Sequence, residues 1–594
     1  VNGISRHNAA SAKIIPVFNN NLLWVRAFGY IPSQLGEKMD QMSEPDEIPS
    51  PIQSRRSFLK AGGAALGAAS TVGLPGLAGA KDAATGAGTG KAGGKRGGIL
   101  RFATRSEARG IDPHKNLFYN VSQPLAATSQ GLLDIAPDVA PAPGIASEWN
   151  ISDDLQTYTF RLRPGVSFHN GADVDAAAVK WNFERIMDPK ISHPFARSSL
   201  ENIKEIVAVD KYTLRCTLRR PSAVFLANIT YYPCNLIAPG SASENSSHPV
   251  GCGPFKFKSW KAWDRTELVR FENYFETDAD GTALPYLDGI VGSPKKQDRA
   301  RLVALQNGDV DLIDHLGYAD AGQFRRRFGE KFQTWSVPQV GTAWIGFNLK
   351  TGPFSYQNPE GHALRTAAAH AIDQEAVHQS VFYGLGTPTN RFYGPDSPWH
   401  MPDVTPGPEF NPDKARFLLR RHNLANTPII LVSRQDFAYM HQAGELIQAM
   451  WAEVGFDVVH EIHPNKVLRE KFHLGGNQAG VYDADSTASS YHADPDGWFN
   501  RSLLSTSPST RLRLGYNSGR VDTLIREARI TRDRQKRMHL YTEVENIINE
   551  DLPLIYTHTV PLLQGGVKNL AGYEPAFAGP FSTAQSGIRT AHFV

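Results

Sequence analysis

The sequence predicts an α/β protein, and two separate stretches support this prediction. In residues 157–162 apolar and polar side chains alternate, which is typical of a strand with one buried face, and a helical pattern follows soon after. In residues 429–460 two short apolar runs enclose a longer stretch with helical spacing. A strand, a helix and a second strand in this order form the repeating unit of a doubly wound sheet.

The first stretch predicts a hairpin followed by a helix. The turn falls at the polar residues 152–154, after a strand that contains Trp149. Asp173 stands where the following helix should begin, and an aspartate is a good N-terminal cap. The helix presents one apolar stripe, formed by Val179, Phe183, Ile186 and Met187.

The second stretch contains the most regular helical pattern in the chain. Strands are expected at 429–432 and 456–460, and Gly455 supplies the helix stop between them. Residues 521–549 predict two further helices. The apolar stripe of the helix before Gly455 consists of Ala443, Leu446, Ile447, Met450, Trp451 and Val454.

Charge and length limit the class of protein. The formal net charge is +3 for 594 residues, so no strong attraction to nucleic acid or to an anionic membrane follows. About 500 residues follow the low-complexity segment that ends near residue 96, enough for two or three domains with their own cores. No internal repeat is found.

Three cysteines are too few for a disulfide scaffold, and they lack metal-binding spacing. Cys216 lies on an alternating strand and is expected to be a buried thiol. Cys234 and Cys252 flank a loop of 17 residues and could pair in an oxidising compartment. Folding in a reducing cytoplasm before export would oppose that pairing, so both states remain open.

A series of short motifs occurs in a recognisable order between residues 97 and 594. They are Gly97–Arg101 with Gly110–His114, the block 130–187, Pro249–Phe255, Asp264–Phe275, Leu305–Asp311, Phe347–Asn348 with Leu364–Asp373 and Gly384–Pro388, Phe410–Ala415 and Asp551–Tyr556. Together they resemble the extracellular solute-binding proteins of ABC importers, in the branch that serves dipeptides, oligopeptides, nickel chelates and opines. Cys252 stands where that family usually has threonine.

The resemblance implies an α/β, two-lobed fold of the type II periplasmic-binding-protein kind, with an extra inserted subdomain and a ligand cleft between the lobes. We expect the chain to cross between the lobes near Thr342 and near Pro553, and these crossings to act as the hinge. The implied ranges are 97–130, 249–342 and 553–594 for lobe I, 131–248 for its inserted subdomain, and 343–552 for lobe II.

The N-terminal segment fits the twin-arginine export signal. Ser54–Lys60 matches the consensus with Arg55 and Arg56, and an Ala/Gly-rich stretch leads to an A-x-A cleavage site ending at Ala80. The alternative, a short membrane anchor, is disfavoured because Leu, Ile and Phe are scarce in this stretch. No cysteine lies near the cleavage site, so a lipid anchor is not expected. Residues 1–53 read as a non-structural upstream extension, 54–80 as the signal and 81–96 as a disordered linker.

A search for catalytic motifs finds little. His460, Glu461 and His463 resemble half of a zinc motif, but a spacing of three on a strand cannot reproduce the helical pair of HExxH. The Asp residues at 483–496 do not follow the order of a calcium loop. We therefore expect no enzyme activity, no metal and no cofactor. The alternative is a secreted metal- or cofactor-dependent enzyme that uses the twin-arginine route because it folds before export.

The expected site residues follow from departures from the family. Members that bind a free α-amine resemble one another in placing Asp four residues before the Pro of a "DPD" turn, where this chain has Tyr491. Some members place an Arg for a ligand carboxylate six residues upstream of this position, where this chain has Asp485. Oligopeptide binders can present a Glu four residues after the Pro of the "LDPH" turn, where this chain has Leu117. If these offsets slip by one or two residues, Asp494 could bind the amine instead. The remaining expected lining residues are Tyr119, Trp344 and His492.

An unpaired buried ammonium costs several kcal/mol, so this cleft should bind simple di- and tripeptides weakly or not at all. It would suit an amine-blocked peptide, a sugar- or opine-like conjugate, or a metal chelate. The expected function is the periplasmic solute-binding component of an ABC importer, a monomer whose partners are the solute, the permease and ATPase subunits, and the twin-arginine translocase. Nucleic acid is not an expected partner.

Overall fold

The structure is a computed structural model that describes residues 94–107, 112–115, 123, 125–241, 248–473, 481–576 and 587–594. These residues belong to one compact unit, Gly90–Val594. The expected upstream extension, the signal peptide with Arg55 and Arg56, and the linker before residue 94 lie outside the described residues.

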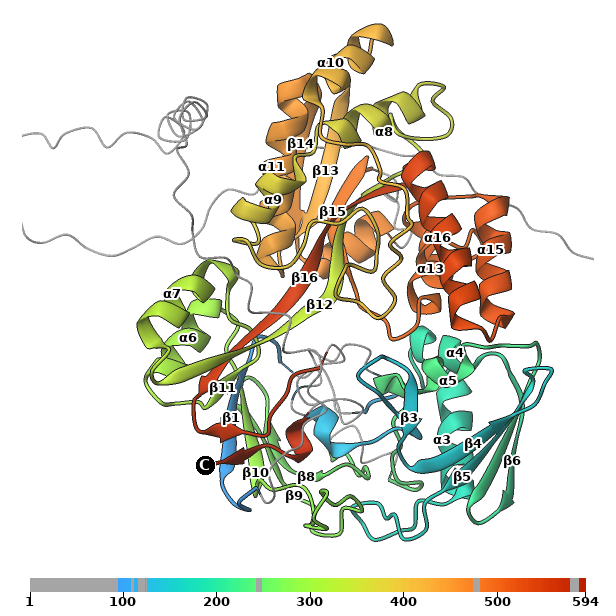
Figure 1. Ribbon diagram of the computed structural model, residues 1–594, viewed down its shortest axis with the longest axis vertical. Helices are drawn as coiled ribbons and strands as arrows, with labels where there is room; N and C mark the ends of the chain where they lie inside the picture. Colours follow the sequence, from blue (N-terminus) through green and yellow to red (C-terminus); the bar gives the residue numbers. More distant parts are fainter. Residues whose placement is uncertain are drawn as a thin grey trace, which may run out of the picture. The chain divides into compact units, whose positions relative to one another are not determined.

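A ten-stranded sheet contains strands of both lobes, in the order β14-β13-β15-β12-β16-β11-β1-β10-β9-β8 (Figure 1). The strands of lobe I are β1 (Ile99–Thr104), β8 (Phe255–Lys261), β9 (Arg265–Arg270), β10 (Gly289–Pro294) and β11 (Leu312–Ile313). The strands of lobe II are β13 (Pro428–Arg434), β14 (Asp457–His463) and β15 (Ala484–Ser490). In each lobe one strand lies between two parallel neighbours: β1 between β10 and β11, and β13 between β14 and β15.

Two long antiparallel strands join the lobes, β12 (Phe332–Phe347) and β16 (Leu554–Val567). Nearly all of β16 is buried, including its polar residues Thr557, His558, Thr559 and Gln564. Their pairing is interrupted between Val337 and Gly341, where three residues of β12 face Pro561 alone. Pro338 and Pro561 have no N–H to donate, so the ladder cannot close at this point. Pro553 lies at the far end of the ladder, where its carbonyl accepts the N–H of Phe347 (3.1 Å).

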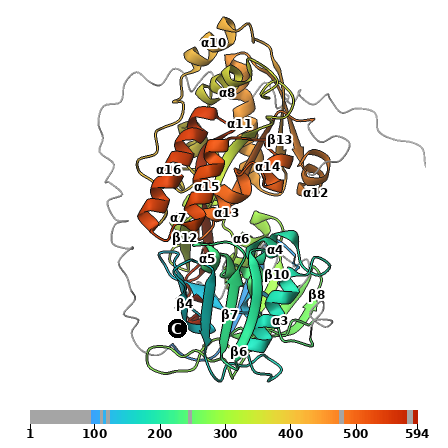
Figure 2. The same ribbon diagram turned by 90° about the vertical axis from the view of Figure 1, so that its right-hand side faces the viewer.

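A separate four-stranded antiparallel sheet forms the inserted part of lobe I. Its order is β4 (Ala146–Ile151), β5 (Thr157–Leu162), β7 (Thr213–Leu218) and β6 (Ile203–Asp210), and α3 (Ala176–Met187) packs on it (Figure 2). The predicted hairpin is present, with its turn after Ile151. The predicted cap is wrong by two residues: the carboxylate of Asp175 accepts the N–H of Ala178 (2.8 Å), whereas Asp173 pairs with Lys211.

The predicted strand-helix-strand unit of lobe II is confirmed by parallel β13 and β14 with α11 (Ala438–Val454) between them. Gly455 ends the helix at φ +115°, a conformation that glycine adopts without strain. The last predicted helices are α15 (Gly519–Ile530) and α16 (Arg534–Asp551), which pack on each other (Figure 2). His460 and His463 lie on β14, where His460 bonds Ser433 (2.7 Å).

Shorter elements complete the two lobes. In lobe I these are β2 (Leu133–Ile135), β3 (Pro141–Pro143), α4 (Pro194–Leu200), α5 (Phe225–Ile229), α6 (Asp298–Gln306), α7 (Tyr318–Phe328), β17 (Leu570–Ala571) and β18 (His592–Phe593). In lobe II they are α8 (Gly361–His370), α9 (Gln374–Ser380), α10 (Pro412–Arg421), α12 (Asn465–Val467), α13 (Asp496–Ser502) and α14 (Pro508–Leu512).

All three cysteines are buried free thiols, so the possible Cys234–Cys252 disulfide is not formed in this structure. The two thiols have different neighbours: Cys234 Sγ lies 3.7 Å from the carbonyl of Asn228, and Cys252 Sγ lies 3.8 Å from that of Gln130. Burial raises the pKa of each thiol, including Cys216 on β7, to about 12. They are therefore thiols rather than reactive thiolates at neutral pH.

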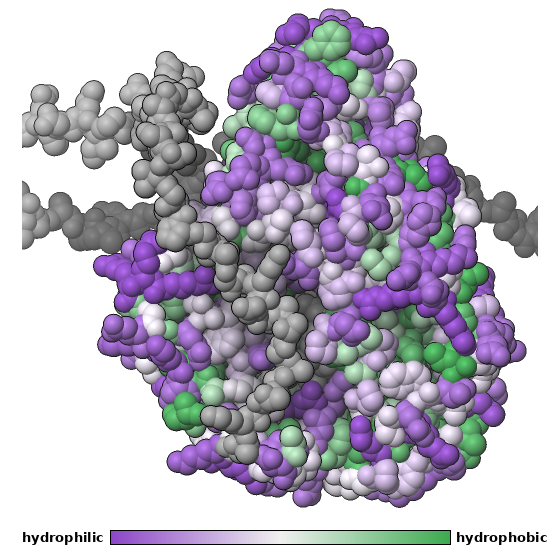
Figure 3. Space-filling view, viewed as in Figure 1, coloured by the Kyte–Doolittle hydropathy of each residue, from purple (hydrophilic) through white to green (hydrophobic). Residues whose placement is uncertain are grey.

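Hydrophilic side chains predominate on the face drawn in Figure 3, and the apolar ones form small scattered groups among the described residues. Within the described part of the chain, no helix combines the length and the apolar character needed to cross a membrane.

Candidate functional site

The parallel strands of each lobe end in polar side chains. In lobe I, Arg105 follows β1 and Asp314 follows β11. In lobe II, Arg434 ends β13, and Tyr491 follows β15. Ligands of open α/β sheets bind beyond the carboxyl ends of the strands, so these ends are the first place to look for a site.

Side chains from the two lobes contact each other near these strand ends. The guanidinium of Arg105 lies 5.6 Å from the ring centroid of Phe437, and that of Arg434 lies 5.0 Å from the same ring. A second contact pairs the rings of Tyr231 and His492, with centroids 6.4 Å apart. We call the region around these contacts, Arg105 and Tyr231 on lobe I with Arg434, Phe437 and His492 on lobe II, the junction.

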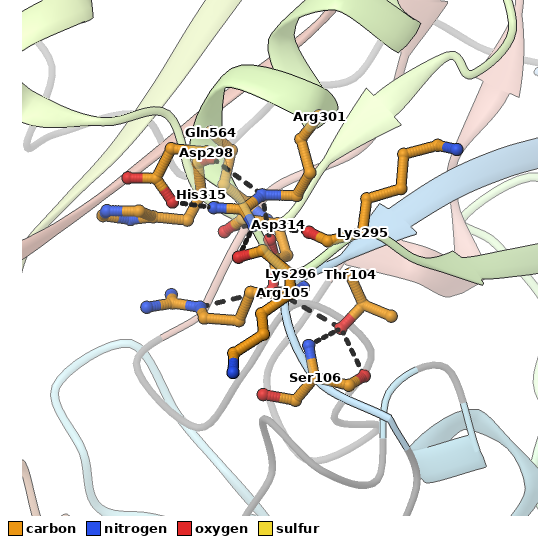
Figure 4. A network of polar contacts seen from close by, with 10 residues as sticks. All are labelled: Thr104, Arg105, Ser106, Lys295, Lys296, Asp298, Arg301, Asp314, His315 and Gln564. Carbon is orange, nitrogen blue, oxygen red and sulfur yellow. Dashed lines mark hydrogen bonds and ion pairs between the residues drawn. The ribbon is translucent and has the colours of Figure 1, made fainter. Parts of the chain in front are cut away.

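Arg105 is held by a polar network at the carboxyl ends of β1 and β11 (Figure 4). The carboxylate of Asp314 accepts the backbone N–H of Arg105 (2.9 Å) and its Nε–H (3.4 Å). On its other side Asp314 pairs with the fully buried Arg301 (3.2 Å), which also donates to the carbonyl of Lys295 (2.7 Å). Gln564 of β16 donates to the Asp314 carbonyl (3.5 Å). The network therefore fixes the end of β1 to β11, to α6 and to β16, the strand that returns from lobe II.

Trp344 and Asp485 are brought together by an arginine that the sequence did not single out. Arg513, just after α14, lies 4.4 Å from the ring centroid of Trp344, and its Nε donates to Asp485 (3.0 Å). His473 Nε2 lies 3.0 Å from the same carboxylate. Burial pushes the pKa of Asp485 up, but Arg513 and His473 oppose it more strongly and keep that pKa well below its ordinary value. Asp485 is thus a buried counter-ion of Arg513.

His492 belongs to the junction and Tyr491 precedes it in the chain, and both side chains are buried. The Tyr491 hydroxyl shares a hydrogen bond with Ser397 (2.8 Å), and burial raises its pKa to about 12. Burial and, to a smaller extent, the positive charge of Arg501 lower the pKa of His492 to about 3. Both side chains are therefore neutral at pH 7, and neither can serve as the ionic partner of a ligand ammonium.

Asp494 is already paired inside lobe II. Arg537 binds it bidentately, with Nη1–Oδ2 and Nη2–Oδ1 distances of 2.8 and 2.6 Å. Asp496, two residues on, lies 3.0 Å from Arg529. Both carboxylates are buried, so the "DPD" turn fastens α13 to the pair of helices α15 and α16.

Four arginines from different elements of lobe II influence one another electrostatically. They are Arg434 at the end of β13, Arg469 in the π-helical segment 468–473, Arg501 on α13 and Arg513 after α14. Arg501 is exposed at the surface. Partial desolvation lowers its pKa; Tyr231 acts in the opposite direction, and Arg513 and Arg469 add to the lowering. Burial likewise lowers the pKa of Arg434, to which Arg513 contributes.

The structure thus places Trp344 and Asp485 beside Arg513, places Tyr491 and His492 in sequence after β15, and gives Asp494 a structural partner; that any of them contacts a ligand stays a prediction. Leu117 and Tyr119 lie outside the described residues. The arginines escaped sequence reasoning because they come from distant elements and share no local spacing. The one feature of the sequence that could have indicated them is that each arginine stands at the end of a strand or in or just after a short helix. Among the described residues no group of three His, Cys, Asp or Glu side chains is arranged to hold a metal ion.

The two lobes, the shared long strands and the inserted sheet define the class of two-lobed periplasmic binding proteins. Among solved structures, the chain is similar to the ABC transporter-associated periplasmic binding protein of Helicobacter pylori in complex with a peptide. The TM-score is 0.71 at 22% identity, covering 84% of this chain and 98% of that one. It is also similar to the oligopeptide-binding protein of Bacillus subtilis in complex with a nonapeptide, with a TM-score of 0.70 at 19% identity, covering 84% and 100%.

The family follows from the sequence comparisons. Residues 140–511 match the model of the bacterial extracellular solute-binding proteins, family 5, and the chain belongs to this family. It is 28% identical over 484 residues to the glutathione-binding protein of Pectobacterium atrosepticum, covering 79% of this chain and 90% of that protein. It is also 28% identical over 479 residues to heme-binding protein A of Haemophilus influenzae, covering 74% and 83%. The protein is therefore a periplasmic solute-binding component of an ABC importer, a class that is not normally enzymatic.

Proposed function

We propose that the protein captures a peptide-like or related solute at the junction and releases it to the permease and ATPase subunits of an ABC importer. The observation that carries the proposal is the meeting of side chains from both lobes at the carboxyl ends of their parallel strands. A solute bound to both faces would favour the closed arrangement of the lobes, because it interacts fully with both only when they approach. The closed form is what a permease would recognise.

The interruption of the β12–β16 ladder supplies a candidate hinge. Thr342, one of the two expected crossing points, lies next to the interruption between Val337 and Gly341. On the returning strand we place the crossing at Pro561 rather than at Pro553, because Pro553 is at the lobe II end of the ladder. A point with few ladder hydrogen bonds can change φ and ψ at the lowest cost, which is what a hinge requires.

Two measurements test the capture mechanism. Native mass spectrometry of freshly purified protein should show a retained solute that denaturation releases chemically unchanged. Small-angle X-ray scattering should then show a smaller radius of gyration with this solute than without it. A scattering curve that never changes with a bound solute would contradict closure, and release of a processed product at turnover rates would favour an enzyme.

We further propose that simple di- and tripeptides bind weakly or not at all. Tyr491 is neutral, and Asp485 and Asp494 are already paired with arginines, so a ligand ammonium has no carboxylate among these three positions. The free-energy cost of burying an unpaired ammonium does not arise for an amine-blocked peptide, a sugar- or opine-like conjugate or a metal chelate. Calorimetry with Ala-Ala and tri-Ala should give no micromolar binding. Tight binding that blocking the N-terminus abolishes would overturn this proposal.

The sequence supports export by the twin-arginine translocase, cleavage near Ala80 and a free, monomeric periplasmic protein. Changing Arg55 and Arg56 together to lysine should leave the precursor in the cytoplasm. The measurement is the distribution of the protein between periplasmic and cytoplasmic fractions, followed by N-terminal sequencing of the exported form. If the double variant is exported to the periplasm as efficiently as the wild type, the twin-arginine route is excluded.

A further inference from the structure

We propose that residues 529–534 of lobe II, where α15 ends and α16 begins, are a latch that binds the inserted part of lobe I when the lobes close. This inference rests on the lobe closure of the proposed function and names the surfaces that hold the closed arrangement. It also gives a role in closure to the four-stranded sheet and to the buried "DPD" turn.

Backbone and side-chain hydrogen bonds connect the latch to the inserted part. The N–H of Ala223, which precedes α5, donates to the carbonyl of Arg529 at the end of α15 (2.7 Å). The Nη2 of Arg532 donates to the carbonyls of Ile151 (3.3 Å) and Ser152 at the turn between β4 and β5. Hydrogen bonds are directional, so these contacts together specify one relative position of the two surfaces.

Arg534, the first residue of α16, adds a third point of contact. Its Nη2 donates to the carbonyl of Asp138 (3.4 Å), in the loop between β2 and β3, and to that of Pro398 (2.9 Å) in lobe II. Its guanidinium lies 4.4 Å from the ring centroid of Trp399, also in lobe II. Lobe II therefore holds this side chain in the direction in which it meets Asp138, so little conformational entropy is lost when the lobes close.

The surface on the inserted part is held together by its own hydrogen bonds. The N–H of Ser222 donates to the carbonyl of Leu155 (3.1 Å), and the hydroxyl of Tyr158 donates to the carbonyl of Ser222. These bonds fasten the segment before α5 to the turn between β4 and β5. Ala223 and Ile151 therefore meet the latch as parts of one unit.

The "DPD" turn holds the latch to the rest of lobe II. Asp496 lies 3.0 Å from Arg529, and Asp494 binds Arg537, whose Nε donates to the carbonyl of Ala528 (3.1 Å). The turn follows β15 in the chain. These contacts therefore connect the strand ends near the junction to the latch.

The latch is partly exposed, which limits its strength. The ion pairs at its edge are long, 3.9 Å from Arg532 to Asp153 and 3.8 Å from Arg534 to Asp138, and both aspartates are exposed. Exposed ion pairs contribute little, so the hydrogen bonds to carbonyls provide most of the attraction, and their net contribution is modest. Such a latch shifts the balance between the open and closed arrangements without locking it, which suits a protein that must release its solute.

The test measures the separation of the lobes in the full, dialysed protein without added solute. Spin labels at Lys204→Cys in β6 and His539→Cys in α16 report this separation in double electron–electron resonance. Both positions are exposed, and the three native thiols are buried. Two distance populations are expected. Arg532→Ala combined with Arg534→Ala should lower the ratio of the shorter to the longer population about fivefold or more.

Arg526→Ala is the matched control, because this arginine lies on α15 and its guanidinium binds Asp522 on the same helix (2.9 Å). It should leave the ratio unchanged. The proposal is overturned if the double variant has the wild-type distance distribution, or if Arg526→Ala changes the ratio equally. If a retained solute reduces the radius of gyration of the wild type while the double variant keeps the wild-type distances, the latch is overturned and the capture mechanism stands.

Discussion

Glu545 is a residue whose burial has a measurable consequence. It lies on α16, fully buried, and its Oε1 accepts the N–H of Phe392 (2.9 Å). Burial raises its pKa from 4.5 to about 8, although the hydrogen bond from Phe392 opposes the shift. The folded protein therefore holds this proton over a pH range in which the unfolded chain has lost it.

We expect the free energy of unfolding to fall as pH rises from about 4.5 to about 8, by at most about 1.4 kcal/mol per pH unit from this group. Glu545→Gln should remove that slope and stabilise the protein at pH 8, because the amide keeps the acceptor without the charge. Urea unfolding at pH 5, 6, 7 and 8 measures the free energy of unfolding and its slope with pH. Glu550→Gln, an exposed position on the same helix, should keep the slope. Identical slopes for Glu545→Gln and the wild type would contradict the assignment.

At the scale of elements, the pairing of β12 with β16 is regular over most of its length, with a small register shift between Ala343 and Trp344 and a wider interruption between Val337 and Gly341. Residues 344–346 of β12 are paired in regular register on both sides, with β15 and with β16. Between Val337 and Gly341 the pairing with β16 is interrupted, and two prolines supply no N–H.

Amide hydrogen exchange should therefore be faster in peptides covering 337–341 and 560–562 than at residues 344–346. Fewer closed hydrogen bonds leave these amides open to solvent more often. A bound solute that closes the lobes should slow exchange at the interruption between Val337 and Gly341 and leave exchange at residues 344–346 unchanged. Equal protection along the whole strand would argue against a hinge here.

Elements with a local pattern could be predicted from the sequence, and those that depend on distant partners could not. The stripe that ends at Gly455 specified α11 because helix periodicity and a glycine stop are both local. The cap before α3 was misplaced by two residues, since Asp173 and Asp175 are chemically equal and only the backbone distinguishes them. The grouping of Arg434, Arg501 and Arg513 needs the tertiary fold, because no spacing relates three separate elements.

For the whole molecule, the continuous ten-stranded sheet predicts that the lobes unfold together. Both lobes include part of β12 and β16, so loosening either removes pairing from the other. Thermal unfolding of the solute-free protein should give one transition that coincides in far-UV circular dichroism and tryptophan fluorescence. A solute at 100 times its Kd should add about 2.7 kcal/mol to the free energy of unfolding. Two separated transitions would show that the lobes are independent.

The place of β16 in the sheet has a consequence for biosynthesis. It lies between β12 and β11, in the middle of the sheet, yet it follows every other strand of that sheet in the chain. On the ribosome, the other strands of the sheet emerge before β16 has been synthesised. Until then the edges of β12 and β11 that pair with β16 are exposed. Neither lobe can be finished during synthesis, so a nascent chain of this protein depends on being kept from pairing with other chains until its last long strand arrives.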